Sequence, residues 1–151
     1  MAAVHDRAEN AGVLRYLGQG LDPAQVSAGP VPPDVNTWRL GAHPDIVSRL
    51  WEELNGALPA DARHLVAGGA ALVHPTSGIV LGTALGTQYA LHLTPGGRDA
   101  AVLAGAETVH TYRTVDVTLD LATTFGRDWV FGTFDEREAQ WLSAAYELYA
   151  A

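Results

Sequence analysis

Cysteine and lysine are both absent from this chain, and methionine occurs only once. Without cysteine there is no disulfide framework, no thiol nucleophile and no cysteine-based zinc site. Without lysine there is no phosphate-binding P-loop, because that motif requires a lysine. No apolar stretch reaches the roughly 20 residues that a membrane-spanning helix needs. These absences exclude several functional classes, but they do not identify an activity.

Positive charge is also scarce. Lysine plus arginine number 9 and aspartate plus glutamate number 17, so the formal net charge is −8. Nucleic acids and anionic membranes are bound through clustered basic residues, so we expect neither as a partner. A basic protein partner is electrostatically favoured instead. The N-terminal residues do not resemble a signal peptide, and we therefore expect a cytoplasmic protein. Abundant alanine, glycine and arginine without lysine is typical of a GC-rich bacterial coding sequence.

The composition indicates an ordered chain. Hydrophobic residues make up 48% and charged residues 17%, which is too apolar for a disordered chain. A length of 151 residues predicts a single globular domain over residues 1–151. Glycine and proline punctuate residues 18–42, and we expect a long ordered loop there, draped over the core. Asp22-Pro23 predicts one short helical turn within this loop.

Two helices are indicated in the first half of the chain. Asp6 followed by Glu9 is a capping-box pattern, which predicts a helix that runs to Leu17. A second helix is predicted over residues 44–55, because proline suits a first helical position and the apolar residues that follow form one stripe.

A third helix is predicted near the C-terminus. Asp135 and Glu138 form a second capping box, and Phe134 is placed to pack on Ala139 as a hydrophobic staple. The apolar residues of this segment recur at helical spacing, so we expect one face to be buried.

The segment between these helices reads as strands. Short turns are predicted at residues 75–78 and 94–97, and short turns join antiparallel strands. Apolar and polar residues alternate over residues 109–121, which exceeds the usual strand length, so we expect a break near 113–115. The predicted fold class is α+β: an antiparallel sheet of about five to six strands over residues 63–134. N-terminal and C-terminal helices pack against it, on one face of the sheet.

Histidines are the first candidates for chemistry. His74, His92 and His110 all fall on predicted strands, where a zinc site with Asp116 or Asp120 is conceivable. No two of them have the spacing that fixes two ligands locally, so we favour scattered structural histidines and expect no metal and no cofactor. A small ligand-binding or metal-dependent enzyme domain that uses His92, His110 and Asp116 is the alternative.

Two further polar patterns are weaker. Ser77 follows His74 closely, but the surrounding residues do not form a nucleophile elbow, and a hairpin turn is the expected structure. Asp116 and Asp120 would stand roughly 13 Å apart on an extended strand. That separation is too wide for a glycosidase pair, so we interpret these residues as part of a solvated face.

Small residues mark a possible close approach to the backbone. On one continuous strand, glycines spaced by four would share a face, and this pattern is formed by Gly78, Gly82 and Gly86. Large side chains of a helix, such as one carrying Trp51 or Trp141, are the favoured cover for that face. A ligand is the alternative cover.

Trp38 stands beside Arg39 in the long loop, and tryptophan and arginine are enriched in interface hot spots. A core plug is the other interpretation of Trp38. We expect a small acidic protein-interaction or accessory module, a compositional profile shared by immunity-type proteins. Self-association through a sheet edge is a further expectation, because an antiparallel sheet has edges to protect.

Overall fold

A computed structural model of the chain describes residues 4–112 and 117–151. The first half contains η1 (Val4–Asp6), η2 (Ala8–Asn10), α1 (Ala11–Leu17), η3 (Pro23–Gln25), β1 (Ala28–Pro30), η4 (Thr37–Arg39), α2 (Pro44–Ser48), η5 (Arg49–Leu54), β2 (Arg63–Val66) and β3 (Gly69–Val73). The second half contains β4 (Val80–Leu85), β5 (Gln88–His92), α3 (Pro95–Leu103), β6 (Val109–Tyr112), β7 (Val117–Asp120), α4 (Leu121–Thr124), β8 (Trp129–Phe131) and α5 (Glu138–Leu148).

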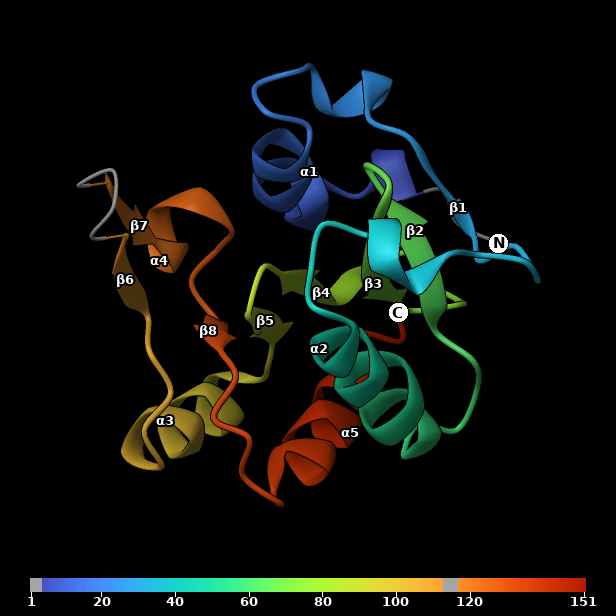
Figure 1. The fold of residues 1–151 in the computed structure, drawn as a ribbon. Coiled ribbons are helices and arrows are strands. Elements are labelled where there is room, and N and C mark those ends of the chain that lie inside the picture. Colours follow the sequence, from blue (N-terminus) through green and yellow to red (C-terminus); the bar gives the residue numbers. More distant parts are fainter. Residues whose placement is uncertain (1–3, 113–116) are drawn as a thin grey trace.

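Six strands form one antiparallel sheet in the order β1-β2-β3-β4-β5-β8 (Figure 1). The predicted α+β class is therefore confirmed. The alternating segment that begins at Val109 is a hairpin of β6 and β7, in which Val109 lies opposite Asp120. An isolated bridge between Glu107 and Phe131 joins this part of the chain to the main sheet. The predicted break near residues 113–115 lies outside the described residues.

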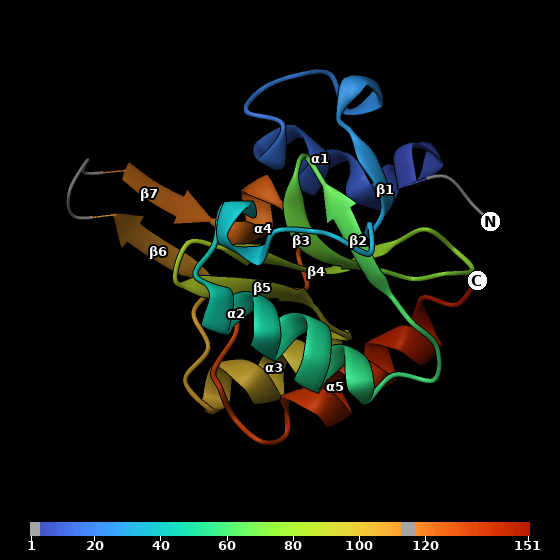
Figure 2. The same ribbon diagram turned by 45° about the vertical axis from the view of Figure 1, so that its right-hand side comes forward.

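Helices cover both faces of the sheet, as Figure 2 shows. On one face α2, η5, α3 and α5 contribute to a core with the side chains of Leu72 and Leu91. On the other face α1 and α4 pack over Ala71 and Val80. The prediction of helices on one face was wrong, because neighbouring residues such as Ala71 and Leu72 are both fully buried. Strands that are apolar on both faces need cover on both.

The long loop over residues 18–42 contains more structure than expected. Its predicted helical turn is η3, which Asp22 caps by accepting a hydrogen bond from the amide of Ala24 at 2.9 Å. Its edge strand β1 was not predicted, because Gly29 and Pro30 are rare in strand interiors. In the sheet, β1 pairs with β2 alone, at an edge where a proline is tolerated.

Three helix starts, those of α1, α3 and α5, differ from the predictions. Asp135 does not cap α5, which begins at Glu138 with Arg137 as its N-cap residue and without a side-chain cap hydrogen bond. The expected turn at residues 94–97 is the first turn of α3, where Thr94 accepts a hydrogen bond from Gly97 at 2.9 Å and Pro95 occupies the first position. Residues 4–10 form two 3-10 turns, and α1 begins only at Ala11, so the predicted Asp6 cap was wrong. The helix predicted over residues 44–55 is confirmed as α2 followed by the π-helical η5.

Asn10 joins the N-terminal segment to the sheet. Its side chain is buried, with 1% of the residue exposed. The amide group donates to the carbonyls of Val4 and Gly78, each at 2.8 Å. The amide oxygen accepts from the backbone N–H of Val80 at 2.9 Å. This one residue therefore fixes the start of β4 against the N-terminus.

In the parts of the chain that the structure describes, no helix combines the length and apolar character needed to cross a membrane.

Candidate functional site

A three-residue helical turn, η4, forms a ridge on the surface, and we refer to Thr37–Arg39 as the ridge. Asn36 caps it, because its side-chain oxygen accepts from the backbone N–H of Trp38 at 3.0 Å. Trp38 itself is 78% exposed. The following residue, Leu40, is buried in the core and anchors the ridge. Of the two interpretations of Trp38 in the sequence, the structure therefore excludes the core plug.

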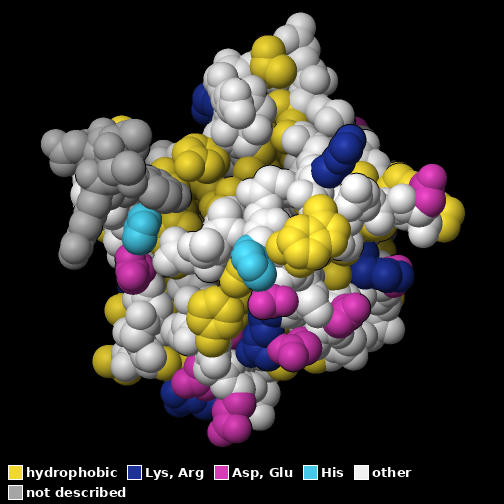
Figure 3. Space-filling model, in the orientation of Figure 1, with side chains coloured by type: hydrophobic (Ala, Val, Ile, Leu, Met, Phe, Trp, Pro, Cys, Tyr) yellow, Lys and Arg dark blue, Asp and Glu magenta, His cyan; other side chains and the backbone are white. Residues whose placement is uncertain are grey.

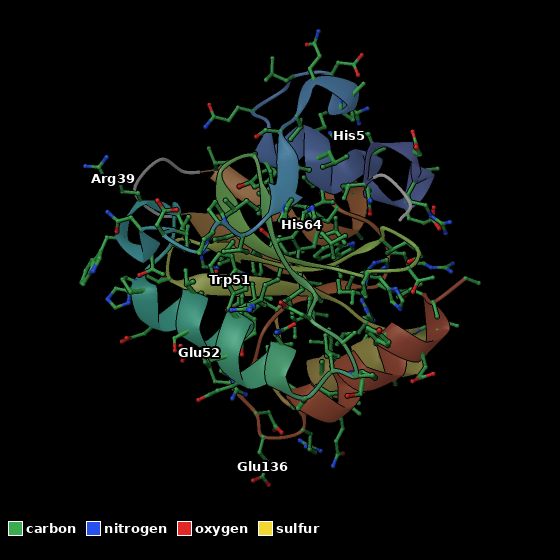
Figure 4. The ribbon with its side chains drawn as sticks, turned by 90° about the vertical axis from the view of Figure 1, so that its right-hand side faces the viewer. His5, Arg39, Trp51, Glu52, His64 and Glu136 are labelled. Atoms are coloured by element: carbon green, nitrogen blue, oxygen red, sulfur yellow. The ribbon has the colours of Figure 1, made fainter. Side chains whose placement is uncertain are left out.

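One groove runs between residues 30–37 and the helix formed by α2 and η5, with a volume of about 440 Å³. Its floor is apolar and includes Val31, Val47 and Trp51. Figure 4 shows Trp51 turned toward the sheet and Glu52 turned outward from the same helix. Thr37 of the ridge also lines this groove. We call it the acidic groove because two carboxylates, those of Glu52 and Asp61, line it.

That second carboxylate is Asp61, which also lines the acidic groove. Arg63 donates to it from Nε and Nη2, both at 3.0 Å, and these bonds lower the pKa of Asp61 to about 2. Asp34, Asp45 and Glu52 have no arginine partner in the described part of the chain. The surroundings of the acidic groove therefore carry uncompensated negative charge.

A second groove lies on the other side of the ridge, between α1, the ridge and the β2–β3 turn, with a volume of about 800 Å³. Arg15 and Arg39 line it, and no carboxylate among the described residues does, so we call it the arginine groove. Hydrophobic side chains (yellow) floor the hollow in the upper part of the face in Figure 3. In Figure 4, Arg39 projects outward on the side nearer α1. Tyr16, Gly41 and Leu85 are shared with an adjoining hollow that reaches His110 and Phe134.

His92, predicted as a candidate site residue, lies in the core. Its Nδ1 donates to the carbonyl of Val80 at 3.2 Å, and its ring stacks between Trp129 and Tyr149 at centroid distances of 5.1 and 4.3 Å. Burial lowers the pKa of His92 below its usual value. These contacts give His92 a packing role.

His110, the second candidate, lies on β6 and lines the adjoining hollow. Its Nδ1 is 3.1 Å from the carboxylate of Glu107, and its ring meets the ring of Phe131 edge-on. Asp116, the third candidate, is outside the described residues. Within residues 4–112 and 117–151, no group of three or more histidines and carboxylates is arranged to hold a metal ion.

His74 and Ser77 are both buried in the turn between β3 and β4. The Nδ1 of His74 accepts from the backbone N–H groups of Thr76 and Ser77 at 3.1 and 3.3 Å, and its Nε2 donates to the carbonyl of Tyr146 at 3.1 Å. The ring is therefore neutral and fully bonded, and burial lowers its pKa. Ser77 Oγ accepts from the backbone N–H of Ile79 at 3.3 Å, an arrangement that stabilises a turn.

The three glycines do not share a strand. Gly82 is within β4, where an added Cβ would lie 3.1 Å from Leu91 Cδ2 and 3.4 Å from Leu50 Cδ1. Leu50 of η5 thus covers this one position, where the sequence interpretation expected a larger side chain such as Trp51 or Trp141. Gly78 and Gly86 lie in turns with φ of +79° and +58°, so the assumption of one continuous strand was wrong.

A buried polar network escaped the sequence analysis. Glu138, 1% exposed, accepts hydrogen bonds from the hydroxyl of Tyr89, from Arg49 Nη2 at 3.1 Å and from the backbone N–H of Thr133 at 2.7 Å. Burial raises the pKa of Tyr89 above its usual value. The network joins η5, β5 and the start of α5. The sequence assigned Glu138 to a local cap with Asp135, and no local pattern indicates its distant partners.

Comparisons of the chain with protein-family models, with curated proteins and with solved structures found no match. The function is therefore argued from the surfaces described above, because a fold class alone does not specify a function.

Proposed function

We propose that this protein is an interaction module that binds a basic segment of a partner protein across Trp38 and the acidic groove. The observation that carries the proposal is the exposure of Trp38, 78%, on a turn whose backbone is fixed by Asn36 and Leu40. An ordered, exposed tryptophan can bury a large apolar area on binding while losing little conformational freedom. Trp38 also adjoins the groove, because Thr37 lines it.

Charge supports a basic partner. Glu52 lines the acidic groove, and Asp34 and Asp45 are neighbours in the sequence of residues that line it. None of the three has an arginine partner among the described residues, and the net charge of the chain is −8. Such an excess accelerates the encounter with a positively charged surface and disfavours acidic competitors. A module of this kind fits an accessory or immunity-like role, in which it accompanies or neutralises a more basic protein.

The alternative of an enzyme that uses His92, His110 and Asp116 draws less support. The ring of His92 is enclosed by Trp129 and Tyr149, whereas His110 lines a hollow that His92 does not reach. A general base must lie within hydrogen-bond reach of the substrate proton that it removes. His92 does not line any of the grooves described above.

The test uses a random library of short peptides selected on the intact protein. We expect the selected peptides to be rich in arginine, lysine and large apolar residues. Trp38→Ala should weaken their binding by at least tenfold, and Glu52→Gln should weaken it about threefold. Leu103→Ala is the matched control, since Leu103 is 90% exposed on α3, away from the ridge. Peptides that bind Trp38→Ala as tightly as wild type, or that are acidic, would overturn the proposal.

A further inference from the structure

Two arginines differ from the other described arginines in their charge environment. Eight arginines are described, and six of them form ion pairs with aspartate or glutamate. The two without a carboxylate partner in the described part of the chain are Arg15 and Arg39, and both line the arginine groove. They come from separate elements, the last turn of α1 and the ridge. In a chain with almost two acidic residues for each basic one, this local reversal of charge needs an explanation.

Apart from Gln19 and backbone groups, the rest of the arginine groove is lined by hydrophobic side chains. Tyr16, Leu40 and Leu85 line it together with backbone from the turn at Ala67 and Gly68. Its volume of about 800 Å³ falls within the range of small-molecule sites. A surface that combines two cationic forks with an apolar floor is complementary to a molecule with one anionic end and one apolar end.

Residues with a strained backbone conformation line the arginine groove and the adjoining hollow. Gln19, Ala67 and Phe134 are the described residues other than glycine that have a positive φ. Gln19 and Ala67 line the arginine groove, and Phe134 lines the adjoining hollow. Conformations of this kind cost free energy and recur at ligand clamps and other functional sites.

We propose that the arginine groove is a binding site for a small amphiphilic organic anion. Its oxyanion head group lies between the guanidinium groups of Arg15 and Arg39, and its apolar body lies on Tyr16, Leu40 and Leu85. The site is independent of the proposed protein-interaction face, because it is on the opposite side of the ridge and has the opposite charge. A carboxylate and a phosphate ester share the required chemistry, since both accept the paired hydrogen bonds of arginine.

The experiment titrates the full chain with three probes that share an octyl chain and with inorganic phosphate, using calorimetry and amide NMR. Octanoate and octyl phosphate test the two head groups, octylammonium tests the charge, and inorganic phosphate tests the need for an apolar body. We expect octanoate, octyl phosphate or both to bind saturably with Kd below about 1 mM. We expect octylammonium and inorganic phosphate to bind at least tenfold more weakly. Amide shifts should concentrate at Tyr16, Gly41 and Gly68.

Substitutions of Arg15 and Arg39 test whether these two side chains bind the anionic head group. Arg15→Gln and Arg39→Gln should each weaken binding of the tighter probe about tenfold, and the double variant should abolish it. Arg127→Gln is the matched control, because it removes the same charge from a largely exposed side chain outside the groove. Thermal unfolding confirms that each variant folds. The proposal fails if neither octanoate nor octyl phosphate saturates the protein, if octylammonium binds as tightly, or if Arg127→Gln weakens binding as much as Arg15→Gln.

Discussion

Replacing Asn10 with alanine should destabilise the fold far more than its small volume suggests. The substitution deletes the two hydrogen bonds that its amide group donates to Val4 and Gly78 and the one that its oxygen accepts from Val80. All three lie in a site that leaves 1% of Asn10 exposed, so bulk water does not readily replace them.

The magnitude follows from these three bonds. A typical hydrogen bond contributes about 1 kcal/mol net, and buried groups left without a partner cost about 1–3 kcal/mol each. We therefore expect Asn10→Ala to lower the free energy of unfolding by about 3 kcal/mol. At this chain length that loss corresponds to a fall of about 6–12 °C in the thermal midpoint. Asn10→Asp keeps the acceptor but points a carboxylate at two carbonyls, so it should destabilise at least as much at neutral pH.

Equilibrium unfolding in urea measures the effect, with an unchanged m value as the check on two-state behaviour. The matched control is Asn36→Ala, which removes one exposed cap hydrogen bond and should cost about 1 kcal/mol. If the free energy of unfolding of Asn10→Ala lies within about 1 kcal/mol of the wild-type value, buried hydrogen bonds are not what holds the N-terminal segment against β4.

Three further substitutions test other parts of the fold. Ala67→Gly should raise the free energy of unfolding by up to about 1 kcal/mol in urea titrations, because the φ of Ala67, +52°, suits glycine. A lower free energy of unfolding in this variant would contradict the positive φ at Ala67. Burial lowers the pKa of His74 from 6.5, so the unfolded state binds more protons below that pH. Stability should therefore fall from about pH 7 to pH 5, less steeply in His74→Asn, and equal slopes would refute the role of His74. Gly132→Ala should lower the thermal midpoint sharply, since its Cβ would overlap the ring of Tyr89, and an unchanged midpoint would show that the ring moves freely.

Local patterns predicted the elements that are stabilised locally. The helix over residues 44–55 carries its own start signal in Pro44 and its own apolar stripe, and the turn after β3 follows from a short connection of turn-forming residues. The strand β1 was missed because its stability comes from pairing with β2, which overrides the low strand preference of Gly29 and Pro30. The start of α3 was missed because Pro95 and the glycines after it also suit a turn.

The candidate surfaces depended on contacts that no local pattern contains. The sequence indicated Trp38 and Arg39 as binding residues, but their exposure follows from how Asn36 and Leu40 fix the ridge. The arginine groove is assembled from α1, the ridge, the β2–β3 turn and the end of β4. Only the three-dimensional structure shows that Arg15 is beside it, because 23 residues separate Arg15 from the next arginine-bearing element.

The two-sided cover of the sheet has a consequence for how this protein can diverge. Strands β3, β4 and β5 lie between two apolar layers, so substitutions there are constrained by packing on both sides. Trp38, Arg39 and Arg15 are exposed, so substituting them leaves the packing of that interior largely unchanged. Recognition can therefore change through surface substitutions while foldability is retained, and homologues are expected to keep the interior and vary in which molecules they accept.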